Sequence, residues 1–197
     1  MKSVTPRFLL LGVFALLGFS GCVTHIKTDV TQNPPPAEKF SAFAHIEIAR
    51  VVLPAPYAGQ AANEKAVRKI QENIDLNTHA MLLRWRQSPP EGGGDRTLVV
   101  EPRIVEVKFI NTTSRIWSFA FSGSSAVVLE AKFTDKQTGK LIAQPVFYAR
   151  AEAVGGAFTF GVTDNLMLTR AAKRFTDYLE ANYKDAVGGP SGAVAPK

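Results

Sequence analysis

The sequence predicts an α+β fold with the element order β-α-β-β-β-α, in which an antiparallel or mixed sheet packs against two helices. Three observations predict it. Apolar residues recur at helical spacing in two long stretches, they alternate with a period of two in four others, and turns rich in glycine or proline separate these stretches. The region that holds them spans about 150 residues, which is the size of one domain with one core.

The first predicted strand and the first predicted helix precede a turn rich in proline and glycine. Residues 43–53 alternate in polarity and end at Pro54, which predicts a strand. Residues 60–87 carry one apolar stripe at helical spacing, formed by Val67, Ile70, Ile74, Met81 and Trp85. The opposite face is charged and is interpreted as solvated: Lys65, Arg68, Lys69, Glu72 and Arg86. Residues 88–94 end the helix.

Three strands are predicted next, over residues 97–110, 126–135 and 141–153. In the first, Ile104 continues the face of the preceding apolar residues, whereas Val105 and Val107 fall on the other face. A pattern of period two cannot change face without an extra residue, so we expect a bulge or bend after Pro102. In the second, four side chains point inward: Val127, Leu129, Ala131 and Phe133. A turn over residues 135–140, with Gly139 available for a positive φ, leads to the third.

The last predicted element is a helix over residues 163–184. Thr163 or Asp164 can cap its N-terminus, because both side chains accept hydrogen bonds from the first free backbone N–H groups. Its buried stripe consists of Leu168, Ala172, Phe175 and Leu179. The two helices thus each have one apolar face with which to cover the sheet.

The N-terminus has the composition of an export signal. Lys2 and Arg7 precede an uncharged, largely apolar run over residues 8–19. As a helix this run would span about 18 Å at about 1.5 Å per residue, well short of a hydrocarbon core of about 30 Å. Residues 1–21 are therefore predicted to be a cleaved signal peptide and not a transmembrane helix.

Cys22 is the one cysteine of the chain. The sequence Phe19-Ser20-Gly21-Cys22 resembles the bacterial lipobox, although Phe19 stands where the lipobox usually has Leu. This resemblance implies that Cys22 is diacylated, becomes the first residue of the mature chain and anchors it stably to a membrane. Val23 replaces the Asp that commonly retains lipoproteins at the inner membrane, which implies the periplasmic face of the outer membrane. The alternative is an ordinary secretory signal in which Cys22 is a buried thiol.

The segments on either side of the domain lack core-forming patterns. Residues 22–38 are predicted to form the lipidated cysteine and a proline-rich tether, because three consecutive prolines follow Asn33. Residues 39–186 are predicted to form the single α+β domain. Residues 187–197 consist mostly of glycine, proline and small residues without periodicity, so we expect a disordered tail.

Two stretches beside glycines alternate large aromatic residues with small ones. If extended, the first places Trp117, Phe119 and Phe121 on one face, and the second does the same for Phe158 and Phe160. They lie directly before and after the two hairpin strands, so pairing of these strands would bring the five aromatic side chains together. These side chains either cap the core where the sheet curves, or form a patch for a partner, a lipid or a ligand.

Residues that carry chemistry are scattered. The three histidines lie far apart in the sequence: His25, His45 and His79. The pair formed by His45 and Glu47 is typical of a surface pair and not of a metal site. Cys22 is the lone thiol, and neither a phosphate loop nor a Gly-x-Ser-x-Gly motif occurs. Without the two basic residues of the signal, the formal charge of +6 falls to +4, too small an excess to predict nucleic-acid binding. We predict no catalytic residue, metal, cofactor or nucleic-acid partner.

One local motif and the overall pattern resemble a known kind of protein. A strand, the sequence Asp135-x-x-Thr138-Gly139-Lys140-Leu141, a return strand and a C-terminal helix are similar to the small, uncharacterised envelope lipoproteins of Gram-negative bacteria. The pattern also resembles that of periplasmic assembly lipoproteins. The resemblance implies a non-enzymatic interaction or assembly module that is bound to the membrane through Cys22 and contacts an envelope protein or lipid. The alternatives are a carrier or sensor that binds a small apolar ligand between sheet and helix, and an enzyme that acts on envelope polymers.

Overall fold

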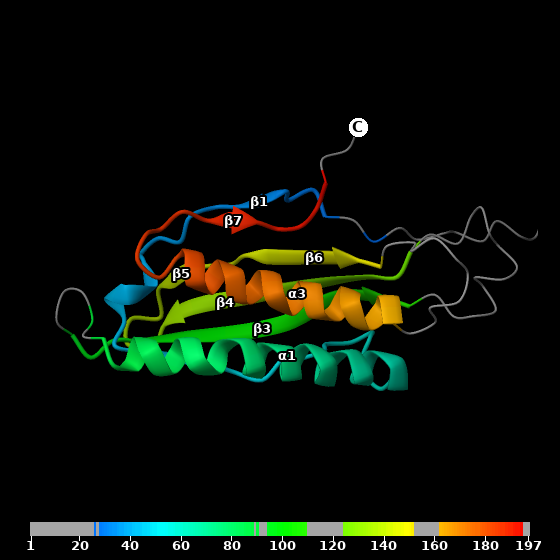
Figure 1. Ribbon diagram of the computed structural model, residues 1–197, viewed down its shortest axis with the longest axis horizontal. Helices are drawn as coiled ribbons and strands as arrows, with labels where there is room; N and C mark the ends of the chain where they lie inside the picture. Colours follow the sequence, from blue (N-terminus) through cyan, green and yellow to red (C-terminus); the bar gives the residue numbers. More distant parts are fainter. Residues whose placement is uncertain are drawn as a thin grey trace, which may run out of the picture.

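The computed structural model describes residues 26, 28–88, 90, 94–109, 124–151 and 162–194. Two long helices, α1 (Ala61–Arg86) and α3 (Val162–Ala181), lie side by side over one face of a five-stranded sheet (Figure 1). Both helices begin at the same end of the sheet (Figure 1). The predicted α+β fold, with two helices packed against a sheet, is confirmed. Within the described part of the chain, no helix is both long and apolar enough to cross a bilayer.

The sheet is mixed. The strand β2 (His45–Ile48) pairs in parallel with β3 (Thr97–Lys108), and α1 forms the crossover between them. The strand β4 (Ala126–Asp135) pairs antiparallel with β3 on one side and with β5 (Leu141–Ala143) and β6 (Val146–Arg150) on the other. The predicted strand over residues 141–153 is thus divided in two, and the break contains Pro145, which has no N–H to donate to a ladder.

The expected bulge is present in β3. Ile104 lies opposite Leu129 and Glu106 lies opposite Val128, so Val105 is the extra residue of the bulge. Ile104 and Val107 are consequently both buried on the core side of the sheet, although an even alternation would have placed them on opposite faces. The phase change seen in the sequence is therefore a real feature of the backbone.

The core lies between the sheet and the helices and is rich in aromatic side chains. Phe40, in the 3-10 helix Phe40–Ala42, stacks on Phe133 of β4 with ring centroids 5.2 Å apart. Phe147 meets Phe175 of α3 edge to face at 5.9 Å. The stripes predicted for both helices face this core: Ile70, Ile74, Met81, Leu168, Ala172, Phe175 and Leu179 are buried, and Val67 and Trp85 are partly buried. The four inward side chains predicted for β4 are fully buried.

The two flanking segments pack against the body, which differs from the prediction. The strand β1 (Gln32–Asn33) pairs antiparallel with β7 (Gly189–Pro190). The Asn33 side chain donates to the Val146 carbonyl at 2.9 Å and accepts from the Val146 N–H at 2.8 Å, so it imitates a paired strand along the edge of β6. Tyr148 N–H also donates to the Ser191 carbonyl at 2.8 Å. The prediction of a disordered tail is therefore wrong for residues 187–194, while residues 195–197 lie outside the described residues.

Asn182, directly after α3, accounts for the order of the C-terminal segment. Its buried side chain donates to the carbonyls of Tyr178 and Gly188 and accepts from the N–H groups of Val187 and Gly188. Gly188 has a φ of +76°, and a Cβ there would collide with the Asn33 carbonyl oxygen. Only glycine suits a turn of this conformation so close to β1.

Candidate functional site

Three of the predicted sites lie outside the described residues. These are the lipidation site Cys22, the aromatic side chains of Trp117, Phe119 and Phe121, and those of Phe158 and Phe160. All five aromatic residues belong to the connections from β3 to β4 and from β6 to α3. The structure therefore says nothing of their surroundings, and both the patch and the lipidation remain predictions.

The described ends of these two connections lie together. Lys108, at the end of β3, is opposite Ala126, at the start of β4, and Ala126 is opposite Arg150, at the end of β6. Ala151 N–H then donates to the Ser125 carbonyl at 2.8 Å. Because α3 also begins at this end (Figure 1), both aromatic connections leave the body and return to it at one end of the sheet.

The N-terminal segment reaches the body at this same end. The Tyr148 hydroxyl donates to the Ile26 carbonyl at 3.4 Å. Tyr148 lies opposite Val128, and Val128 lies opposite Glu106, close to the end of β3. Ile26 follows Cys22 by four residues, which span at most about 14 Å at about 3.5 Å per residue. This end lies near the predicted lipidation site Cys22 along the chain, and we therefore call it the anchor end of the body: the ends of β3 and β6 and the starts of β4, α1 and α3.

A cleft of about 620 Å³ opens at the anchor end between the two helices and β3. Its wall on the α1 side includes Ala62 and Ala66, its wall on the α3 side includes Leu168, and β3 and the residue after it contribute Val107 and Phe109. Ala66, Val107 and Leu168 are buried, whereas Ala62 is exposed at the mouth. The remaining lining residues are Tyr57, Gln60, Asn63, Lys65, Lys108, Asp164 and Asn165.

Local hydrogen bonds fix the loop that enters α1 beside the cleft. Asn63 Nδ2 donates to the Tyr57 carbonyl at 2.9 Å, and Gly59 N–H donates to Glu64 Oε1 at 3.0 Å. Glu64 lies in the first turn of α1, where a carboxylate interacts favourably with the helix dipole. These hydrogen bonds therefore fix the loop that forms one side of the mouth of the cleft.

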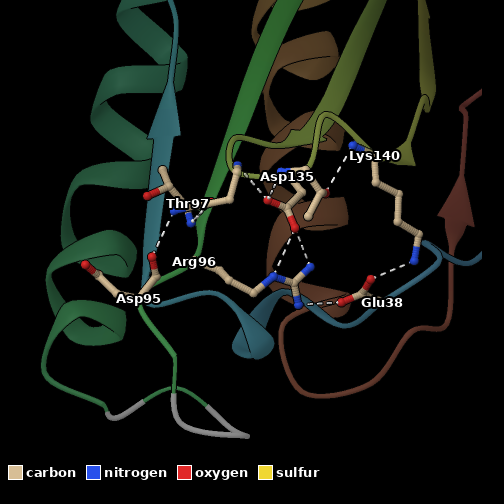
Figure 2. A network of polar contacts seen from close by, with 8 residues as sticks. Glu38, Asp95, Arg96, Thr97, Asp135 and Lys140 are labelled. Atoms are coloured by element: carbon tan, nitrogen blue, oxygen red, sulfur yellow. Dashed lines mark hydrogen bonds and ion pairs between the residues drawn. The ribbon is translucent and has the colours of Figure 1, made fainter.

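The opposite end of the body carries a network of charged side chains (Figure 2). Arg96 donates to Asp135 Oδ2 from Nε at 3.0 Å and from Nη2 at 2.6 Å, and to Glu38 Oε2 from Nη1 at 2.8 Å. Lys140 Nζ donates to the other Glu38 oxygen at 2.8 Å. The Arg96 guanidinium also lies over the Phe43 ring, 4.4 Å from its centroid. The network joins the N-terminal segment, the start of β3 and the turn after β4.

Asp135 is the centre of this network. Its side chain is inaccessible to solvent, and its Oδ1 accepts the N–H groups of Gln137 at 2.8 Å and Thr138 at 3.2 Å. The hydrogen bonds from Arg96, together with those two N–H groups, lower the pKa of Asp135 to about 2. Hydrogen bonds from Arg96 and Lys140 lower the pKa of Glu38 as well. Both carboxylates are thus held ionised and engaged, an arrangement suited to holding segments together and poorly suited to proton transfer.

The histidine and carboxylate pair noted in the sequence does not form one site. His45 Nε2 lies 3.0 Å from Asp95 Oδ1, whereas Glu47 pairs with Lys136 Nζ at 2.9 Å. His79 is exposed on α1, and His25 lies outside the described residues. Among the residues that the structure describes, no group of three or more His, Cys, Asp or Glu side chains is arranged to hold a metal ion.

Neither the lining of the cleft nor the charged network is predicted by the sequence. The network had one local signal, because an Asp at the start of a tight turn commonly accepts backbone N–H groups two and three residues later. Arg96 and Glu38 have no such signal, since they lie 39 and 97 residues away from Asp135 in the sequence. The sequence carries a weaker signal for the cleft: Ala62 and Ala66 occupy the first turns of a helix whose later turns carry larger apolar side chains.

No protein-family model and no curated protein matches the chain. It is similar to solved structures that include a protein of the DUF330 family from Xanthomonas campestris, with a TM-score of 0.40, 14% identity and coverage of 82% of this chain and 97% of that one. The PelC dodecamer from Paraburkholderia phytofirmans matches with a TM-score of 0.38 and 11% identity, over 74% of this chain and 93% of that one. A minor lipoprotein from Acinetobacter baumannii matches with a TM-score of 0.34 and 12% identity, over 71% and 94%.

One of these three structures, that from Acinetobacter baumannii, is thus itself a lipoprotein, the kind of protein that the sequence resembles. Because the TM-scores of these three matches lie below 0.5, the resemblance carries no argument about activity or partner.

Proposed function

We propose that this protein is a lipoprotein of the Gram-negative envelope, anchored through Cys22 in the outer membrane on its periplasmic side, and that it is a non-enzymatic interaction or assembly module. Its partners are the membrane itself and an envelope protein or lipid. The observation that carries the proposal is the docking of the N-terminal segment, which runs along the body from Glu38 to Ile26 and ends within about 14 Å of Cys22.

This docking orients the body. Lipids on Cys22 would place the anchor end next to the bilayer, and the cleft and the described ends of the two aromatic connections lie at this end. The helix α1 has 26 residues and extends about 39 Å at about 1.5 Å per residue. The charged network at the other end would therefore lie several nanometres away from the membrane, in the periplasm.

The chemistry of the described residues supports a binding role. The network around Arg96 uses its carboxylates to hold segments of the chain together. The cleft is lined mainly by apolar and amide side chains, with Lys65, Lys108 and Asp164 as its charged groups. A surface of apolar side chains with a few polar groups is sufficient to bind an apolar partner.

The anchor is tested by acyl labelling. Wild-type cells grown with labelled palmitate should show label on the protein and recover it with the outer membrane. Cys22→Ser should lose the label and move to the soluble periplasmic fraction. Label on the serine variant, or an unlabelled wild-type protein, would contradict the lipidation.

The interaction surface is tested by crosslinking in intact cells. A photoreactive amino acid in place of Gln60, at the anchor end of α1, should capture an envelope component, whereas the same substitution at Gln87 should not. Both side chains are exposed and they flank the same helix, so they form a matched pair. Trp117→Ala and Phe160→Ala should reduce the capture at Gln60. Equal capture from both positions, or no effect of the two aromatic variants, would argue against the patch.

A carrier or sensor of a small apolar ligand is the second candidate, and the cleft favours it. A volume of about 620 Å³ lies within the range of small-molecule sites, about 300–1,000 Å³. The two candidates differ in what photocrosslinking at Gln60 captures. A protein or a membrane lipid favours the interaction module, and a small apolar molecule that is not a membrane lipid favours the carrier.

A further inference from the structure

The cleft combines an apolar interior with a charged rim. Ala66, Val107 and Leu168 are buried residues of its lining, and they come from α1, β3 and α3. Small side chains at the start of α1 leave space between the helices where later turns carry Ile70 and Ile74. The interior therefore suits an apolar chain and offers few groups that would fix a polar ligand.

The rim favours an anionic group. The charged side chains of the lining are Lys65, Lys108 and Asp164, so the lining as a whole has a formal charge of +1. Lys65 is exposed on α1, one turn from Ala62 at the mouth. An amphiphile with an apolar tail and an anionic head would place its tail between the helices and its head beside the exposed Lys65.

The position of the cleft indicates where such an amphiphile comes from. Two apolar residues on the first two turns of α3 are also exposed at the anchor end: Val162 is 54% exposed and Leu166 is 44% exposed. Ile26, at the same end, lies within about 14 Å of Cys22 along the chain. If Cys22 is lipidated, the cleft opens beside the bilayer that holds those lipids, and phospholipid is the most abundant amphiphile there.

We propose that the cleft binds one acyl chain of an anionic phospholipid from the membrane that carries the anchor, with the phosphate beside Lys65. This inference rests on the proposed function for its location. It adds the chemical class of the ligand, and it makes the cleft a second attachment to the membrane besides Cys22.

The test uses the acylated full-length protein, purified in detergent and reconstituted into vesicles of phosphatidylethanolamine and phosphatidylglycerol. A small share of the phosphatidylglycerol carries a photoreactive diazirine near the end of one acyl chain. After illumination, mass spectrometry of peptides locates the labelled residues. Label should be concentrated on the lining residues of α1 and α3, and a peptide containing Cys22 serves as an internal reference for the anchor.

Two pairs of variants make the test specific. Ala62→Trp should fill the mouth of the cleft and lower cleft labelling about tenfold. This is the loss of affinity expected when about two methylene groups of the acyl chain can no longer be buried. Ala80→Trp is the matched control, because Ala80 is also exposed on α1 and does not line the cleft. Lys65→Glu should lower labelling by the anionic lipid, whereas Arg68→Glu, one turn away and outside the lining, should not.

The readouts separate this inference from the proposed function. Flotation with the vesicles that depends on Cys22 tests the anchor, and the position of the label tests the cleft. Flotation without cleft labelling, or equal labelling of Ala62→Trp and Ala80→Trp, would overturn the acyl-chain site and leave the anchor standing. Cleft labelling together with a wild-type Cys22 peptide that carries no lipid would support the site and contradict the anchor.

Discussion

Replacing Asn182 by Asp should destabilise the protein at the junction that holds the flanking segments. Asn182 is fully buried and makes four hydrogen bonds through its side chain. Two of them are donated by Nδ2, to the carbonyls of Tyr178 at 2.8 Å and Gly188 at 3.0 Å. In Asn182→Asp an oxygen takes the place of Nδ2 and faces these two carbonyl oxygens, so both bonds become repulsive contacts.

The expected fall in the free energy of unfolding follows from these contacts. Two lost hydrogen bonds cost about 1 kcal/mol each, and a buried carbonyl left without a donor costs about 1–3 kcal/mol more. Tyr178 keeps a backbone donor, the Asn182 N–H at 3.2 Å, so the Gly188 carbonyl carries most of this second cost. The free energy of unfolding should therefore fall by about 3–5 kcal/mol. Burial and the nearby carbonyls should raise the pKa of the new carboxyl, so the deficit relative to wild type should shrink toward mildly acidic pH.

Urea unfolding followed by circular dichroism measures the change, since the midpoint and the slope give the free energy. Asn77→Asp is the control: Asn77 is exposed on α1, and its replacement should change stability by less than about 0.5 kcal/mol. Trypsin cleavage after the exposed Lys184, between Asn182 and β7, should become faster in the Asn182 variant. A wild-type midpoint together with unchanged cleavage would refute the role given to this side chain.

Three further predictions concern the body. The pKa of Asp135 is about 2 in the folded protein against an ordinary value of 3.8, so its contribution to stability is complete above about pH 4 and is lost as the pH falls toward 2. Asp135→Asn should weaken that part of the pH dependence in acid unfolding curves, and an unchanged curve would contradict it. Deleting the bulge residue Val105 restores an even alternation and should be tolerated, whereas deleting Arg103 turns the following residues over and should prevent cooperative unfolding in calorimetry. Phe133→Ala should lower the free energy of unfolding by about 3–5 kcal/mol in urea titrations, because the side chain is fully buried among other rings.

The elements that the sequence predicts correctly are those with local signals. The helix α1 was predicted over residues 60–87 and spans Ala61–Arg86, because its apolar stripe and its glycine-rich end are both visible in the sequence. The bulge at Val105 follows from a change of phase between two sets of apolar residues on the same strand. In each case the residues that cause the structure are near neighbours in sequence.

The errors and omissions come from contacts between distant residues. Composition favours disorder for residues 187–194, yet Ser191 is fully buried and its hydroxyl donates to the Val30 carbonyl. Asn33 completes the edge of β6 from 113 residues away. A polar side chain that replaces a strand in this way has no period and no spacing, so periodicity cannot find it. The same holds for Arg96 and Glu38 in the charged network.

The docking of residues 28–38 on the body would change what a lipid anchor on Cys22 can do. A flexible linker from Cys22 to Glu38 would have a root-mean-square length of about 20–24 Å and would let the body turn freely. With the segment docked, three residues separate Cys22 from Ile26, and a lipid on Cys22 would attach the body at one end. A surface at that end would then meet the membrane at a high effective concentration, whereas a surface at the other end would not. Loosening the docking through Asn182 should therefore weaken lipid contact at the cleft without altering acylation, which ties the stability of the flanks to the proposed function.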